Sequence, residues 1–370
     1  MPRNRKEPEH EHLLEVARLR FVDGLDNVEI AHRLKIGRKQ VAARLKQSVT
    51  WLIDQQQRFA SLTAGEPVRE LLEQQLMEKY TFLRKVKVVP RGKLQTGGDY
   101  SELKQRLAVE AAKYFDEIVE SGEFRDKDRH LHVSISGGEF PLAVMNALPD
   151  HARVDVYFYA SAFLGRGPES KFHIDPATNA TIGWLRSGRL AGNCVYATIS
   201  PCELDFKSTA PYERRKNNFM EEVARSADNS IIEGMIGDLD NVTVSFAGLG
   251  MVVREGRVSQ VREPTASDLL TRQGVAPQEL AKDGAVGDIA YCFFDKDGTD
   301  PKGWRFFVTG GYNSGHSGLE YYRRMVKQEK RVVMIAGPFE LPAILAALKG
   351  KLFNVWFTDE ITADEVLKAK

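Results

Sequence analysis

The sequence predicts an α/β fold, with a helix-turn-helix domain at the amino end followed by a doubly wound body. Two observations lead to this prediction. In the first 50 positions, apolar residues recur at the spacing of short helices. From about residue 86 onward, strand-like and helix-like segments alternate, which is typical of a mostly parallel sheet covered on both faces. We therefore expect a helix-turn-helix domain at 1–55, a linker helix at 56–85 and the body at 86–370.

Size and composition are those of an ordinary globular chain. The 370 residues are 42% hydrophobic and 28% charged, which suits two or three domains. No apolar run approaches the ~20 residues needed to span a bilayer, and the first residues lack the apolar region of a signal peptide. Three cysteines are too few for a disulfide framework or a four-cysteine zinc site. We expect a cytoplasmic protein with no membrane partner, no metal and no cofactor.

Charge is unevenly distributed along the chain. The formal net charge is only +1, but residues 1–50 hold 11 Lys and Arg against 7 Asp and Glu. The other 320 residues hold 41 basic and 44 acidic groups. A basic amino end on a mildly acidic body favours contact with nucleic acid, although a solvated charged helix would look the same.

Three short helices are expected in the amino-terminal segment. The first ends near Asp23-Gly24, the second begins after Asp26 as N-cap, and the third runs over 38–48. Gly37 lies in the connector before the third helix, where a capping Ser or Thr is more usual. Two short helices joined by a tight turn with glycine form a helix-turn-helix. A three-helix bundle used for oligomerisation is the alternative.

The third helix carries the residue types that read DNA. We expect Ile36, Val41 and Leu45 to face inward. Arginine can bind guanine edges, glutamine adenine edges, and lysine neutralises phosphate. The residues expected to contact double-stranded DNA are these outward-facing or helix-start side chains: Arg38, Lys39, Gln40, Arg44 and Lys46.

A linker helix follows the amino-terminal domain. Leu72, Leu76 and Leu83 recur at spacings of four and seven, and Pro67 suits the first turn of a helix. Such a helix can pair between subunits or pack on its own body, and the pattern allows both.

The body is expected to contain several strands and helices in alternation. The expected strands lie at 86–90, 130–135, 153–159, 193–199, 242–246, 331–335 and 354–358. The expected helices lie at 102–119, 139–148, 219–236 and 341–348. Ligands of such a fold bind at the carboxyl ends of the strands.

Three glycine-rich stretches are expected to form turns at strand ends. They are Ser136-Gly137-Gly138, Gly248-Leu249-Gly250 and Gly284–Asp288. Glycine there lets backbone N–H groups approach an anion or a sugar hydroxyl, although it also serves plain turns. Gly248 and Gly250 do not complete a dinucleotide fingerprint, because position 253 is valine, and the sequence contains no P-loop motif. His130 and His132 share a strand face without metal spacing, so a structural role is favoured.

The residues then resemble a known family. The helix-turn-helix of 13–48, the linker ending in Val86-Lys87-Val88-Val89-Pro90, and the blocks 284–298 and 343–363 resemble the SorC/DeoR-like sugar-responsive transcriptional regulators. The resemblance implies a winged-type helix-turn-helix on a Rossmann-like, sugar-isomerase-like effector-binding and oligomerisation domain. It also implies a homo-oligomer, tetramer or dimer, and an effector that is commonly a phosphorylated sugar.

The resemblance also assigns effector-binding positions. Gly137 and Gly138 match the glycine loop on the phosphate side, and Asp288 matches an acidic position that contacts sugar hydroxyls. The remaining matches lie beside these or near other effector positions: Gly248, Gly250, Asn179 and Arg272.

Two departures from the family pattern concern charge. The glycine loop continues with Glu139 and Phe140 instead of Thr or Ser, and both join the expected effector-binding residues. The lysine expected after Ala336-Gly337 is absent. One charge contact at ~4 Å is worth about 4 kcal/mol at an effective dielectric of 20. We therefore expect a free sugar, polyol or amine-bearing metabolite instead of a conventional sugar phosphate. Alternatively, Glu139 points to solvent and a phosphate still binds the backbone amides.

The sequence is compatible with three functions. The first is a DNA-binding transcriptional regulator, not an enzyme, whose operator binding changes with a carbohydrate-like metabolite. The second is a sugar-isomerase- or deaminase-like enzyme on the same body fold, with Asp288, Glu139 and His316 as the acid–base candidates. The third is a metabolite-binding scaffold.

The stretch 309–318 suits a loop near the site or a surface loop.

Overall fold

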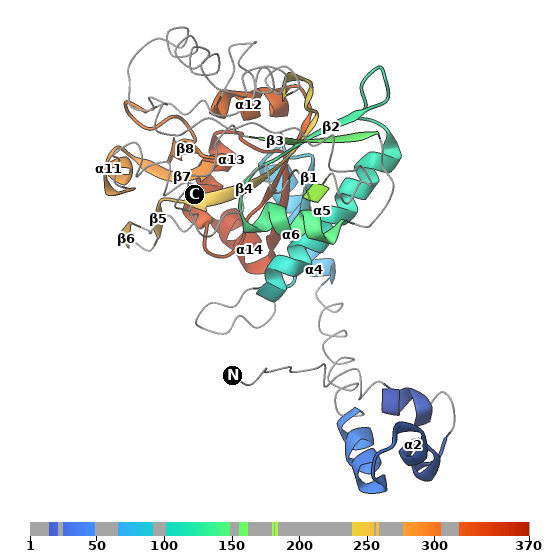
Figure 1. The fold of residues 1–370 in the computed structure, drawn as a ribbon. Helices are drawn as coiled ribbons and strands as arrows, with labels where there is room; N and C mark the ends of the chain where they lie inside the picture. Colours follow the sequence, from blue (N-terminus) through green and yellow to red (C-terminus); the bar gives the residue numbers. More distant parts are fainter. Residues whose placement is uncertain are drawn as a thin grey trace, which may run out of the picture. The chain divides into compact units, whose positions relative to one another are not determined.

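The chain consists of two compact units, Met1–Val68 and Arg69–Lys370, which we call the head and the body. The computed structural model describes residues 15–20, 25–48, 66–91, 101–148, 155–161, 180, 182–183, 239–254, 257–258, 277–304 and 318–369 (Figure 1). Several predictions lie outside these residues: the strand at 193–199, the helix at 219–236, the stretch 309–317, and the positions Asn179, Arg272 and His316.

The head contains the three predicted helices, at 15–20, at α2 (Asn27–Leu34) and at 38–48. Asp26 is the N-cap of α2, and its carboxylate accepts hydrogen bonds from the backbone N–H groups of Val28 and Glu29. The Glu29 carboxylate in turn accepts from the Asp26 N–H at 2.7 Å, which completes a capping box. The predicted N-cap is therefore confirmed.

A small apolar core holds these helices together. Its buried members come from all three helices: Val16, Leu19, Ile30, Ala31 and Val41. Ile36 and Leu45 pack against it and are partly buried. The inward-facing prediction for the third helix is confirmed, and its opposite face is left to solvent.

The body is built on a mostly parallel sheet, as predicted. In spatial order its parallel strands are β1 (Lys85–Val89), β10 (Val355–Asp359), β9 (Arg331–Ile335), β4 (Val244–Met251), β2 (Leu131–Ile135) and β3 (Val156–Ala160). A hairpin of β7 (Ala285–Ile289) and β8 (Cys292–Asp295) joins β4 in antiparallel fashion. A separate small ribbon pairs β5 (Val253–Arg254) with β6 (Arg257–Val258).

The chain changes direction across the sheet between β2 and β4. From β2 it proceeds outward to β3, whereas β4, β9 and β10 follow one another the other way. The carboxyl ends of β2 and β4 therefore flank the switch point, where ligands of open α/β sheets bind.

Helices cover the two faces of this sheet. One face packs against α5 (Ser101–Ser121) and α6 (Glu139–Ala147), with Phe115, Phe246 and Phe357 in the shared core. The core on the other face includes residues of α4 (Glu66–Lys79), α12 (Leu319–Lys327), α13 (Leu341–Lys349) and α14 (Glu360–Lys368). The short helix α11 (Pro277–Lys282) lies just before β7.

The helix α4 packs on its own body. Leu76 is fully buried in the body core, and Glu73 accepts a hydrogen bond from the Val88 N–H of β1 at 2.8 Å. Lys79 Nζ donates to the backbone carbonyl of Val366 at the end of α14. At the start of α4, Val68 and Leu71 are 61% and 53% exposed. The structure therefore confirms the alternative in which this helix packs on its own body. Pairing of the helix between subunits stays a prediction.

Two of the three predicted glycine turns lie mostly in strands instead, although Gly284 is in a turn just before β7 with a φ of 99°. Gly248 and Gly250 lie inside β4, which continues past the parallel sheet to pair with β7. Gly287 and Asp288 lie inside β7. Glycine frequency misled the prediction, because pairing with β9 and β7 makes Gly248 and Gly250 part of a strand, and pairing with β4 does the same for Gly287 and Asp288. No helix in the described part of the chain is long and apolar enough to cross a membrane.

Candidate functional site

The turn after β2 is a predicted glycine turn that the structure retains. Gly138 precedes α6 with a φ of 99°, a conformation that favours glycine. The Ser136 hydroxyl donates to the Gly137 carbonyl at 3.0 Å and accepts from the Gly248 N–H at 2.9 Å. Ser136 thereby joins the carboxyl ends of β2 and β4 at the switch point.

Glu139, the first residue of α6, turns to a cation on the neighbouring helix. Its carboxylate lies 2.6 Å from Lys104 Nζ of α5, and its side chain is 69% exposed. The predicted repulsion of a phosphate by Glu139 is therefore weakened, because Lys104 offsets the charge. Phe140, by contrast, is only 7% exposed and belongs to the apolar core under α6. Its side chain packs against protein, and the assignment of Phe140 to the effector site stays a prediction.

Asp288 and Gly250 lie in direct contact. They are partners in the antiparallel pairing of β7 with β4. A Cβ atom at position 250 would come within 2.0 Å of Asp288 Oδ1, so only glycine leaves room for this carboxyl group. The sequence predicted that Gly250 lies beside Asp288, and the register of the two strands brings them together.

The Asp288 carboxyl group is buried at 8% exposure. Its Oδ2 accepts from the Tyr291 N–H at 3.1 Å, within the tight turn between β7 and β8. Ala290 and Tyr291 in that turn have φ values of 46° and 66°, which are strained for non-glycine residues. Burial raises the pKa of Asp288 to about 6, against a smaller lowering by the Tyr291 N–H. This carboxyl group is therefore able to exchange a proton near neutral pH.

Carboxylates also stand at the ends of β9 and β10. In the segment after Ala336-Gly337, where the resemblance led us to expect a lysine, the Glu340 carboxylate accepts from the Gly337 N–H at 2.7 Å. Asp359 is fully buried at the end of β10 and bonds Arg91 Nε at 2.6 Å. Four acidic side chains therefore lie toward the carboxyl end of the described sheet: Glu139, Asp288, Glu340 and Asp359. Lys104 pairs with Glu139, and Arg91 pairs with Asp359.

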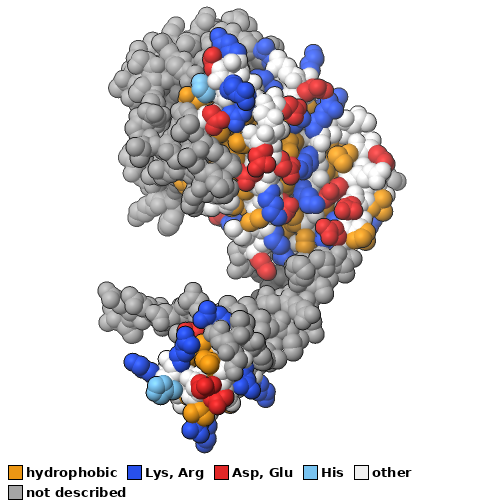
Figure 2. Space-filling model, turned by 90° about the vertical axis from the view of Figure 1, so that its right-hand side faces the viewer, with side chains coloured by type: hydrophobic (Ala, Val, Ile, Leu, Met, Phe, Trp, Pro, Cys, Tyr) orange, Lys and Arg blue, Asp and Glu red, His pale blue; other side chains and the backbone are white. Residues whose placement is uncertain are grey.

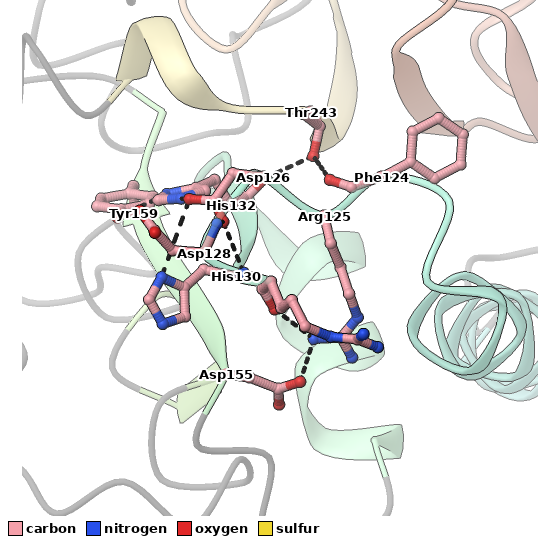
Figure 3. Close-up of polar contacts among 10 residues, drawn as sticks. Phe124, Arg125, Asp126, Asp128, His130, His132, Asp155, Tyr159 and Thr243 are labelled. Carbon is pink, nitrogen blue, oxygen red and sulfur yellow. Dashed lines mark hydrogen bonds and ion pairs between the residues drawn. The ribbon is translucent and has the colours of Figure 1, made fainter.

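The two histidines form a polar cluster at the opposite end of β2 and β3 (Figure 3). One ring nitrogen of His132 lies 2.9 Å from Asp126 Oδ2 and the other 3.0 Å from the Tyr159 hydroxyl. His130 lies beside them, with Nδ1 3.9 Å from the same Asp126 oxygen. No group of three or more possible ligands in the described residues could hold a metal ion. The favoured structural role fits these contacts, which join β2 and β3 to the loop before them.

Along β2 and β3, polar residues alternate with apolar ones. The sequence shows this pattern, but it was not used to predict the site residues. His132, Ser134 and Ser136 alternate with apolar residues on one face of β2. Ser161 continues the same alternation just after β3 and is fully buried. Such polar side chains inside a buried sheet need partners, and this need marks them for attention.

The head presents its basic side chains as predicted. Arg38, Lys39 and Lys46 are exposed, and Arg44 is half-buried. Figure 2 shows Lys and Arg side chains over the visible face of the head. Gln40 is exposed too, but its amide oxygen accepts from the Gly37 N–H at 2.9 Å. Gln40 therefore supplies the cap that Gly37 lacks, a role that the sequence reading missed.

Comparison with known proteins connects this geometry to a family. A family model described as "Putative sugar-binding domain" matches residues 222–368. The full-length sorbitol operon regulator SorC from Klebsiella pneumoniae is similar to the chain at 19% identity, with a TM-score of 0.53, covering 98% of this chain and 100% of that one. The chain has the fold of the SorC and DeoR regulators. No curated protein matches the chain in sequence.

Two further solved structures are similar to most of the chain. A DeoR family transcriptional regulator from Listeria monocytogenes is 18% identical, with a TM-score of 0.55, covering 81% of this chain and 99% of that one. A transcriptional regulator from Streptococcus pneumoniae TIGR4 is 18% identical, with a TM-score of 0.56, covering 82% and 98%. The predicted resemblance to the SorC/DeoR fold is therefore confirmed.

Proposed function

We propose that the protein is a DNA-binding transcriptional regulator of the SorC type that acts in the cytoplasm and responds to a small carbohydrate-like metabolite. The proposal rests on the structure of the head. A helix-turn-helix packed on Val41 leaves Arg38, Lys39 and Lys46 exposed on its third helix. The amino-terminal residues of such a helix meet base edges in the major groove, and cations along it neutralise phosphates.

The similar structures support this proposal. Those from Klebsiella pneumoniae and Listeria monocytogenes are described as an operon regulator and a transcriptional regulator. The matched sugar-binding domain model covers β4, the hairpin with Asp288 and the last two parallel strands. An effector bound at the carboxyl end of this sheet would be held between the turn after β2 and the β7–β8 hairpin.

The effector that fits these charges is a neutral polyhydroxylated molecule, such as a free sugar or polyol. Asp288 is buried beside Gly250, and Glu340 stands where the family lysine is missing. Glu139 adds a third carboxylate, offset by Lys104. A phosphate dianion gains little attraction in such surroundings, whereas hydroxyl groups can donate to carboxylates.

Two further parts of the proposal concern partners. We infer a homo-oligomer, tetramer or dimer, because the operator half-sites of helix-turn-helix proteins are usually read by paired subunits. The exposed Val68 and Leu71 on α4 offer apolar surface for such pairing. The enzyme alternative has less support, because Glu139 is paired with Lys104 and Asp288 contacts Gly250.

A thermal-shift panel tests the effector class. We expect free sugars or polyols to raise the melting temperature of the parent more than their phosphate esters do. Glu139→Thr, which restores the family residue type, should increase stabilisation by the esters. Strong stabilisation of the parent by a sugar phosphate, unchanged in Glu139→Thr, would contradict the proposed class.

A further inference from the structure

The turn between α2 and the third helix of the head has a well-defined helix-ending geometry. Lys35 adopts the left-handed conformation, with a φ of 54° and a ψ of 43°. Its N–H donates to the His32 carbonyl at 3.4 Å, and the Ile36 N–H donates to the Ala31 carbonyl at 3.0 Å. These two bonds form a Schellman motif, and Ile36 completes it by packing on the small core of the head.

Glycine is the residue expected at the left-handed position of this motif. A side chain there crowds the following carbonyl group, so other L-residues destabilise the turn. A cation near the end of a helix gains from the helix dipole, but at an exposed site this gain is smaller than the cost of the left-handed backbone. Lys35 is exposed. A lysine at this position is therefore better explained by a contact outside the turn than by the stability of the turn.

Two other charged residues that follow helices in this conformation have partners within the protein. Glu329, after α12, has a φ of 60° and pairs with Arg84. Lys351, after α13, has a φ of 52°, and its Nζ lies 5.9 Å from the centre of the Phe82 ring. Lys35 makes no ion pair or ring contact with another described residue. Its ammonium group is therefore available to a binding partner.

The charges around the turn suit a phosphate group. Arg33, Arg38 and Lys39 lie within four positions of Lys35, and all three are exposed. None of these side chains forms an ion pair with another described residue. Four such cations close together in the chain attract a polyanion, and double-stranded DNA presents one phosphate charge for about every 1.7 Å of its length.

The opposite end of α2 has the reverse charge. Asp26 and Glu29 are exposed there, and their carboxylates form the capping box. The backbone N–H groups of Asp26, Val28 and Glu29, which could otherwise hold a phosphate at this helix start, already donate to these carboxylates. A phosphate is therefore repelled at the start of α2 and attracted at the turn that follows its end.

We propose that Lys35 binds a DNA phosphate, with Arg33 beside it in the chain, and that the turn between α2 and the third helix is part of the DNA interface. The inference rests on the proposed function and extends it, because the residues predicted to contact DNA all lie on the third helix. Lys35 adds affinity for DNA of any sequence, whereas the third helix reads base edges. The backbone strain at position 35 is of the kind that functional sites retain.

The test compares Lys35→Gly, Lys35→Arg and Asp26→Asn in the full chain. Binding of a labelled DNA duplex of mixed sequence is measured by fluorescence anisotropy over a range of salt concentrations. We expect Lys35→Gly to weaken binding roughly fivefold and to lower the salt slope by about one, while Lys35→Arg binds as the parent does. Asp26→Asn is the matched control, because it also changes the charge of the head by one and asparagine still caps a helix. Its affinity should stay within about twofold of the parent, since salt screens distant charges.

Hydrogen exchange separates this role from a structural one. Exchange of the α2 amides is measured in the same variants at high salt, which screens the helix dipole. We expect Lys35→Gly to slow this exchange roughly fivefold, because glycine relieves the left-handed backbone. Faster exchange in Lys35→Gly would mean that the lysine stabilises the turn, and the inference would be wrong.

The binding data can overturn the inference in two further ways. An affinity and a salt slope of Lys35→Gly that equal those of the parent would show that position 35 contacts no phosphate. A gain of affinity in Asp26→Asn as large as the loss in Lys35→Gly would assign both effects to the overall charge of the head. If Arg38→Ala weakens DNA binding and Lys35→Gly does not, the regulator proposal stands without this inference. If the parent binds no DNA, both are wrong.

Discussion

Asp288 of β7 lies directly against the backbone of Gly250 on β4, with no room for a side chain between them. A Cβ at position 250 would come within 2.0 Å of Asp288 Oδ1. Gly250→Ala must therefore displace the carboxyl group or separate the two strands. We expect a loss of about 1–3 kcal/mol in the free energy of unfolding, measured by chemical denaturation, together with weaker sugar binding.

The matched control for this change lies two residues earlier on the same strand. A Cβ at Gly248 would meet its nearest neighbour, Pro141 Cδ, at an ordinary 3.5 Å. Gly248→Ala should therefore leave stability within about 1 kcal/mol of the parent. Equal losses for both variants would mean that the contact with Asp288 is not what excludes a side chain at position 250.

The raised pKa of Asp288 predicts how stability depends on pH. Its pKa of about 6 in the folded protein exceeds the ordinary 3.8, so the folded state holds this proton more tightly. The contribution is fully present below about pH 4 and is lost as pH rises through 6. Its size is at most about 3 kcal/mol. Asp288→Asn should remove this dependence and make the protein more stable than the parent at pH 8.

The measurement is a series of denaturation curves between pH 4 and 8. Asn keeps an oxygen that can accept from the Tyr291 N–H, so the β7–β8 turn should survive the substitution. Parallel pH profiles for the parent and Asp288→Asn would mean that Asp288 titrates as an ordinary exposed carboxylate.

Gln40 is expected to stabilise the third helix of the head in addition to any contact with DNA. Gln40→Ala removes the acceptor of the Gly37 N–H and should destabilise the head by about 1 kcal/mol. Hydrogen exchange of the amides in residues 38–48 reports this directly. Gln47→Ala, an exposed position of the same helix, is the control.

Gln40→Glu separates the two roles of Gln40. A glutamate can still accept from the Gly37 N–H, as in a capping box, but cannot donate to an adenine edge. We expect normal hydrogen exchange and weaker DNA binding. Normal exchange in Gln40→Ala as well would show that the cap contributes nothing measurable.

Asp126 is expected to stabilise the loop before β2 only while it is ionised. Hydrogen bonds from the His130 backbone N–H and the His132 ring lower the pKa of Asp126. A lowered carboxyl pKa contributes stability above the ordinary value of 3.8, and this contribution is lost as pH falls through the folded value. Asp126→Asn should therefore flatten the acid limb of the stability profile, whereas Asp128→Asn should not. Identical acid limbs in all three proteins would rule out this role.

Much of the fold follows from sequence pattern, because burial enforces periodicity. The strands over Arg331–Ile335 and Val355–Asp359 are apolar runs between loops, and they lie within a residue of their predicted bounds. The N-cap at Asp26 was predictable because capping depends on residues close in sequence. The strands that hold Asp288 and Gly250 were not, because β4 and β7 stabilise each other only after the chain has brought them together.

The candidate site, too, was predictable from the sequence only where the relevant residues are close together in the chain. Gly137 and Gly138 were predictable from a strand followed directly by glycines. The pairing of Glu139 with Lys104 depends on how α5 lies beside α6, a relation that no local pattern contains.

The central claim is that the head binds DNA and that a sugar-like metabolite changes this binding. The most direct measurement is fluorescence anisotropy of a duplex selected from a random pool by the full chain, over a range of salt concentrations, with and without the best sugar of the panel. Arg38→Ala and Arg44→Ala remove cations from the third helix, and Lys368→Ala on α14 is the control, since its exposed side chain pairs with Asp364.

We expect the parent to lose affinity steeply with rising salt, because phosphate contacts release counterions. Arg38→Ala and Arg44→Ala should each weaken binding at least roughly fivefold or lower the salt slope by about one, and the sugar should shift the parent's affinity. DNA binding by both variants that equals the parent, or an affinity that no effector changes, would contradict the account.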